Sequence, residues 1–268
     1  MQNRAGFTGS YVPRVTPPSS ESHISESPSA ASSSSRRTLL RTALTGAALT
    51  AGSWAWDLPA AAAAATPRVS EKPRPATPAA ALRELNAGNR RWRTHHQRHP
   101  HETLAVRREM VSGQHPFAVV LGCIDSRVAP ELVFDQGLGD LLTVRSAGEV
   151  LDEAVLGSVA YGVLELAIPL VVVLGHQSCG AVSAAVHAEE TGERLPAHIQ
   201  YIADQIKPAI DHSHEGAARI DATVSAQVRR VRSQLAAEPD LAARIGAGRL
   251  AIVGARYELT SQLVHPVD

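Results

Sequence analysis

The stretch that decides the fold is Phe117-Ala-Val-Val-Leu-Gly-Cys123, an apolar run that follows Pro116 and leads into a polar segment. Similar runs lie at residues 141–144, 170–174 and 250–253. Continuous apolar runs rich in β-branched residues are typical of strands buried on both faces, as in a parallel sheet covered by helices. The sequence therefore predicts a mainly parallel sheet of about four to five strands.

The segments between these runs have the periodicity of helices. We expect helices at residues 79–92, 103–112, 152–167, 179–190, 195–212 and 222–237. Strands that alternate with helices indicate an α/β fold, in which ligands bind beyond the carboxyl ends of the strands. The functional residues are therefore sought directly after the apolar runs.

Composition excludes several classes of protein. The chain has 268 residues, enough for one or two domains with a sizeable core. Its 26 basic and 26 acidic residues balance, whereas a nucleic-acid-binding protein normally shows a basic excess. Two cysteines are too few for a disulfide-rich secreted scaffold. We expect no nucleic-acid partner.

The N-terminal quarter has the organisation of an export signal. Residues 1–35 are rich in Ser and Pro, and we expect them to be disordered. Arg36 and Arg37 precede a mildly apolar segment that ends in small residues, which predicts a twin-arginine signal peptide at residues 36–66. An amphipathic or disordered tail is the alternative. A Pro-rich linker at 67–78 and a catalytic domain at 79–268 would follow, in a protein exported by the twin-arginine machinery.

Two short motifs carry the candidate chemistry. Cys123-Ile-Asp-Ser-Arg127 follows the first apolar run, and His176-Gln-Ser-Cys179-Gly180 follows the third. Two thiolates and one imidazole form a suitable zinc set, because Zn²⁺ takes sulfur and nitrogen ligands in a tetrahedron. Three protein ligands leave one position for water, which is typical of a catalytic zinc site.

The two cysteines have other interpretations. A buried free cysteine often acts only as a small apolar side chain. Export to an oxidising compartment also allows a disulfide between Cys123 and Cys179. Because the twin-arginine route generally carries folded proteins, zinc could be loaded before export and protect both sulfur atoms.

The two motifs together resemble those of the β-class carbonic anhydrases. The matching stretches are Cys123–Glu131, Phe134–Asp140, Val144–Gly148 and Gly175–Ala181. The resemblance covers roughly residue 79 to the C-terminus. It implies an enzyme that reversibly hydrates carbon dioxide to bicarbonate and a proton, by a hydroxide on one zinc ion per chain.

The resemblance also implies roles for single residues. Cys123, His176 and Cys179 would be the zinc ligands. Asp125 would be held by Arg127 and would accept a hydrogen bond from the water or hydroxide on the metal. In some members of the family this aspartate becomes a fourth zinc ligand and closes the site.

Three further residues are implied on the substrate side. Gln114 stands where the plant-type branch has a substrate-orienting glutamine, and Tyr161 where that branch has an aromatic in the carbon dioxide pocket. The backbone N–H of Gly180 would contact bicarbonate. Sites of this family form in homodimers or dimer-based oligomers, with some groups from the second chain.

One departure and two alternative functions accompany the resemblance. Glu149 follows Gly148 where the family commonly has asparagine; we expect a harmless surface position, the alternative being a changed pocket rim or proton exit. The same site could instead hydrolyse carbonyl sulfide or carbon disulfide, or the protein could be a non-catalytic zinc-stabilised binding protein. A second group of potential ligands is expected to be a solvated surface segment: His95, His96, His99 and His101.

Overall fold

The computed structural model describes residues 74–268. The expected disordered segment and signal peptide, and residues 67–73 of the expected linker, lie outside the described residues. Within residues 74–268, no helix has the length and apolar character needed to cross a membrane. The first helix begins at Pro78, where the Thr77 side chain accepts a hydrogen bond from the Ala80 amide and so caps the helix.

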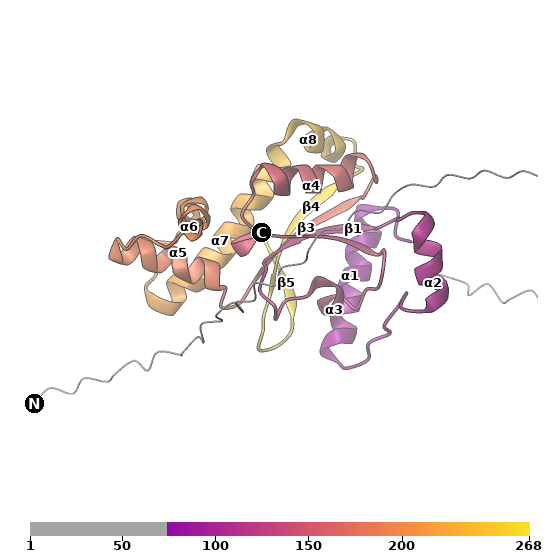
Figure 1. Cartoon of the computed structure of the whole chain (residues 1–268), viewed down its shortest axis with the longest axis horizontal. Coiled ribbons are helices and arrows are strands. Elements are labelled where there is room, and N and C mark those ends of the chain that lie inside the picture. Colours follow the sequence, from indigo (N-terminus) through magenta and orange to yellow (C-terminus); the bar gives the residue numbers. More distant parts are fainter. Residues whose placement is uncertain (1–73) are drawn as a thin grey trace, which may run out of the picture. The chain divides into compact units, whose positions relative to one another are not determined.

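Five strands form one sheet in the order β2-β1-β3-β4-β5. Figure 1 labels β1, β3, β4 and β5. They are β1 (Ala118–Gly122), β2 (Leu141–Arg145), β3 (Leu170–His176), β4 (Ala251–Tyr257) and β5 (Val264–Val267). The first four strands pair in parallel, and β5 pairs antiparallel with β4. The predicted parallel sheet is confirmed. The four apolar runs did not indicate β5, which is short and contains His265 and Pro266.

The strands differ in burial according to their place in the sheet. Strands β1 and β3 are buried along their whole length, as the sequence predicts. The prediction is wrong for β2, which is half-buried. It pairs with β1 alone, so one of its edges has no strand beside it.

The expected helices are present with shifted ends. The structure has α1 (Pro78–Arg93), α2 (Leu104–Glu109), η1 (Met110–Ser112), α3 (Pro130–Val133), η2 (Ala147–Glu149), α4 (Glu153–Leu164), α5 (Gly180–Thr191), α6 (Ile199–Ile206), η3 (Lys207–Ala209), α7 (Gly216–Ala237) and α8 (Pro239–Gly246). The helix expected at 195–212 is shorter, because Pro196 and Pro208 flank its α-helical part. Helix α7 begins six residues before its expected start.

Apolar side chains cover the sheet on both faces. One cluster joins the sheet to α4, α7 and α8, and a second joins it to α1 and α3. Helix α1 lies very close to the end of α3, since a Cβ atom on Gly88 would sit 1.7 Å from the Phe134 carbonyl oxygen. That contact accounts for a glycine in the middle of a helix, where it otherwise costs stability.

The topology brings the two motifs of the sequence together. Strand β1 lies between β2 and β3, so the chain leaves β1 toward one neighbour and returns on its other side. Gly122 at the end of β1 is in register with Leu174 of β3. Cys123 and His176 therefore emerge at adjacent carboxyl ends, at the kind of switch point where open α/β sheets bind ligands.

Candidate metal centre

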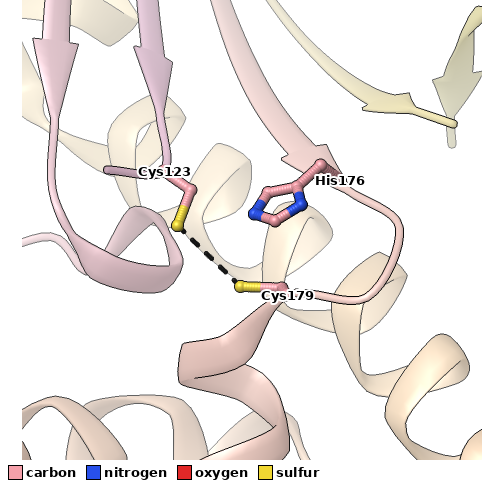
Figure 2. Close-up of side chains that lie close together, drawn as sticks. All are labelled: Cys123, His176 and Cys179. Carbon is pink, nitrogen blue, oxygen red and sulfur yellow. Dashed lines mark hydrogen bonds between the residues drawn. The ribbon is translucent and has the colours of Figure 1, made fainter. Parts of the chain in front are cut away.

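Cys123, His176 and Cys179 meet at this edge of the sheet (Figure 2). Cys123 follows β1 directly, His176 is the last residue of β3, and Cys179 is the N-cap of α5. One ligand atom from each side chain lies within 4.8 Å of the others. Among residues 74–268, this is the one group of three potential ligands gathered so closely. The structure thus brings together the three predicted ligands.

The two sulfur atoms share a buried environment. Cys123 is 4% exposed and Cys179 is 1% exposed, and their Sγ atoms lie 3.9 Å apart without a disulfide. The hydrogen bond from the Cys179 thiol is the main cause that lowers the pKa of Cys123, to about 4. The same contact and burial raise the pKa of Cys179. Two sulfurs this close in a buried place both ionise only with a cation beside them.

The imidazole of His176 presents a free nitrogen to the sulfurs. The side chain is fully buried, and Nδ1 lies 2.9 Å from the carbonyl oxygen of Gln177. A carbonyl only accepts, so this contact places the proton on Nδ1 and leaves a lone pair on Nε2. Nε2 has no hydrogen-bond partner. A buried nitrogen acceptor beside two sulfurs fits a zinc ion.

Asp125 and Arg127 form a charged pair at the open side of the cluster. Nε and Nη2 of Arg127 donate to the two carboxylate oxygens of Asp125 at 2.9 and 2.7 Å, and the Arg127 amide adds a third hydrogen bond at 2.9 Å. The side-chain hydrogen bond from Arg127 is the main cause that lowers the pKa of Asp125, to about 2. Asp125 is therefore ionised at neutral pH, with Oδ2 3.9 Å from Nε2 of His176.

Arg145 is a positioning residue that the sequence analysis did not single out. It ends β2, and its Nε and Nη2 donate to the carbonyl oxygens of Cys123 and Asp125 at 2.8 and 2.7 Å. These bonds fix the backbone of the first motif from the neighbouring strand. The sequence offered one sign of this role, since Arg145 directly follows the apolar run at residues 141–144.

A cavity of about 360 Å³ opens beside Cys123 and Asp125. Gly180, the first residue of α5, lines it as expected for a substrate contact. All the other lining residues are apolar: Ile124, Ala147, Ala181, Ala184, Leu195, Ile199, Ile202 and Ala203. An uncharged apolar molecule fits such a wall better than an ion does.

Gln114 and Tyr161 are not among the residues that line this cavity within a single chain. Gln114 is exposed in the segment before β1. Tyr161 is 52% exposed on α4 and lines a separate open groove beside β2. The structure of one chain therefore assembles the expected metal ligands, the Asp125–Arg127 pair and Gly180, but not these two side chains.

Glu149 occupies a buried position, so the expectation of a surface residue is wrong. It is 1% exposed in the turn η2, and its Oε1 atom has no hydrogen-bond partner. Burial, and then the nearby Cys123, raise the pKa of this carboxyl well above its ordinary value. A sequence pattern could not show this, because the preceding Gly148 and Glu149 itself both adopt positive φ, which turns the chain inward.

The histidines of residues 95–101 hold no such cluster. The Nδ1 atom of His101 lies 2.7 Å from the carboxylate of Asp140, and His95, His96 and His99 are exposed. His95, His99 and His101 adopt positive φ, and the His99 amide donates to the Asp135 carboxylate at 3.2 Å. The expectation of a surface segment holds for the three exposed side chains.

Comparisons with known proteins agree with this geometry. A family model described as carbonic anhydrase matches residues 118–264. Carbonic anhydrase 2 of Mycobacterium tuberculosis is 42% identical over 184 residues, which cover 68% of this chain and 89% of that relative. A carbonic anhydrase of Mycolicibacterium smegmatis shows the same identity and coverage.

Solved structures share the fold. The β-carbonic anhydrase CcaA superposes with a TM-score of 0.56 at 23% identity, covering 68% of this chain and 86% of that one. One of two tetrameric β-carbonic anhydrases of Sordaria macrospora gives 0.57 at 17% identity, covering 69% and 96%. The chain therefore belongs to the carbonic anhydrase family, in its β class, and is an enzyme that hydrates carbon dioxide.

Proposed function

We propose that Cys123, His176 and Cys179 hold one zinc ion, at which carbon dioxide and water are converted reversibly to bicarbonate and a proton. The observation that carries the proposal is the convergence of two buried sulfurs and an unpartnered imidazole nitrogen within 4.8 Å, beside a largely apolar cavity. Zinc, when bound, lowers the pKa of a coordinated water to about 7 and so supplies a nucleophile at neutral pH.

The neighbouring side chains orient the attacking water and keep Asp125 away from the metal. With zinc bound, the ionised Asp125 would accept a hydrogen bond from the water that attacks carbon dioxide and would thereby orient that water. Arg127 occupies both carboxylate oxygens of Asp125 and thereby keeps this side chain from becoming a ligand itself. The Gly180 amide lies at the N-terminus of the twelve-residue helix α5 and on the cavity wall, where it would donate to the anionic product.

We propose further that a second copy of the chain pairs along β2. That strand has a free edge, and beside it lies an open groove lined by Val144, Gly157 and Tyr161 among others. The relatives of Sordaria macrospora are described as tetrameric. A dimer across this edge would let Gln114 and Tyr161 of one chain complete the cavity of the other.

Gly157 provides a clean test of the dimer. A Cβ atom at this position meets nothing within 4 Å in the single chain, so Gly157→Glu leaves the fold intact. In the groove it would place a charged side chain against the second copy. We expect sedimentation to give a dimer or larger for the parent protein and a monomer of low activity for the variant. A variant that sediments like the parent would disprove pairing along β2.

We also propose that the protein is exported by the twin-arginine route. Support comes from Arg36 and Arg37 ahead of an apolar segment that ends in small residues. Replacing both arginines by lysine in the full chain should keep activity inside the cells, while the parent activity appears outside the cytoplasm. Equal distribution of the two proteins in fractionated cells would contradict the proposal.

The enzymatic proposal is tested on the full chain with its metal quantified. We expect one zinc per chain and rapid hydration of carbon dioxide in stopped-flow measurements. Cys179→Ser should lose both zinc and activity. Release of hydrogen sulfide from carbonyl sulfide, measured in parallel, separates the related hydrolase activity. Bound zinc without turnover of either substrate would leave only a zinc-stabilised binding protein.

A further inference from the structure

A single peptide turn links the metal ligand Cys123 to the interior of helix α7. The Gly148 amide donates to Cys123 Sγ at 3.4 Å. On its other side, the Gly148 carbonyl oxygen accepts from Nε2 of Gln227 at 3.1 Å. Gly148 therefore connects a buried glutamine, 79 positions away in the sequence, with one of the two sulfurs.

The backbone conformation of this turn is unfavourable by itself. Gly148 has φ +63°, in the left-handed region that favours glycine. A Cβ atom there would lie 2.7 Å from Cδ1 of Ile206 and 3.2 Å from Cβ of Ala181. Glu149 follows with φ +52°, a costly conformation for a residue with a side chain. Contacts from outside must therefore keep the turn in this conformation.

Gln227 provides such a contact. It is 1% exposed on the face of α7 that also carries Val224 and Val228. A buried amide costs stability unless it is hydrogen-bonded, and an apolar side chain would pack at this position without that cost. Its Oε1 atom has no partner, so the bond from Nε2 to Gly148 is what the glutamine contributes here.

We infer that Gln227 is a positioning residue for the zinc ligand Cys123 and acts through the Gly148 amide. The inference rests on the zinc site proposed above. An N–H donor aimed at a coordinating sulfur fixes the direction of its lone pairs and withdraws charge from it. Loss of partners of metal ligands typically weakens metal binding or activity about 10–100-fold. Gln227→Met keeps much of the side-chain volume and removes the donor.

Thr223 is the matched control. It lies one turn earlier on α7 and is fully buried. Its Oγ1 accepts from the Asp211 amide at 3.0 Å, a hydrogen bond that involves neither the metal ligands nor their turn. Thr223→Val is the same kind of change, from a buried polar to an apolar side chain. A general effect of loosening α7 would therefore appear in both variants.

The experiment measures zinc affinity by chelator competition and the sulfur-to-metal absorption of the cobalt-substituted protein. We expect Gln227→Met to bind zinc about 10–100-fold more weakly and to shift the cobalt absorption, and Thr223→Val to match the parent in both. Parent-like affinity and spectrum in Gln227→Met would overturn the inference. If the parent itself binds no zinc, the proposed function fails instead.

A measurement on the parent protein covers the case that Gln227→Met does not fold. After substitution with an NMR-active cadmium isotope, scalar coupling between the metal and the Gly148 amide proton reports the N–H···S bond to Cys123. We expect that coupling to be present. Its absence, with the metal bound, would show that the turn does not reach the sulfur and would overturn the inference.

Discussion

Replacing Arg127 by alanine separates the positioning of Asp125 from metal binding. Arg127 supplies three of the hydrogen bonds to this carboxylate, two from the guanidinium and one from its own amide. Arg127→Ala removes the first two and keeps the third. None of these bonds involves the three metal ligands, so the protein should fold and retain zinc.

The structure sets the size of the effect. Without the guanidinium, the pKa of Asp125 should rise from about 2 toward its ordinary value of 3.8, so the carboxylate stays ionised at neutral pH. The substitution changes the orientation of the Asp125 side chain. Its Oδ2 already lies 3.9 Å from Nε2 of His176, so without Arg127 the carboxylate can turn into the open position at the metal. We expect kcat/KM for hydration to fall about 10–100-fold, as for other groups that hold a site in place.

The assay is stopped-flow hydration of carbon dioxide on zinc-quantified protein at several pH values. Arg127→Lys is the control, because it keeps the positive charge and loses the two-pronged geometry, and it should recover only part of the activity. Hydration at the parent rate in Arg127→Ala, with zinc unchanged, would refute the role assigned to this arginine.

Three further changes have defined outcomes. Glu149→Gln should raise the free energy of unfolding by about 1–3 kcal/mol near neutral pH. The pKa of Glu149 is raised in the folded state, so this carboxyl lowers the free energy of unfolding increasingly as the pH rises above 4.5, the ordinary pKa of a glutamate. The stability gained by Glu149→Gln, measured by denaturant titration, should therefore shrink as the pH is lowered toward about 5. After removal of the metal with a chelator, a mild oxidant should form a disulfide between Cys123 and Cys179, whose sulfurs are 3.9 Å apart. Mass spectrometry would show the loss of two hydrogens, whereas protein that still carries its metal should resist this oxidation. Gly88→Ala should lower thermal stability markedly, because its Cβ atom would meet the Phe134 carbonyl oxygen at 1.7 Å; an unchanged melting temperature would show that α1 does not pack this closely.

Local patterns in the sequence determined most of the fold. The apolar runs of β1 and β3 could only be buried strands, and helical periodicity placed α1, α4, α5 and α7 between and around them. The metal ligands were also predictable, since Cys123 follows one apolar run, His176 and Cys179 follow another, and parallel strands end at one edge of the sheet. Resemblance to a family added the roles of Asp125 and Arg127.

Only the tertiary structure decided what depends on contacts between distant residues. The inward turn of Glu149 and the bond from Gln227 to Gly148 arise from packing of α7 against η2, which no periodicity records. Strand β2 is half-buried because it lies at the edge of the sheet. The sequence of one strand does not determine its place in the strand order. Local composition fixes secondary structure because backbone preference is local, whereas burial and the surroundings of a metal ligand depend on which segments meet.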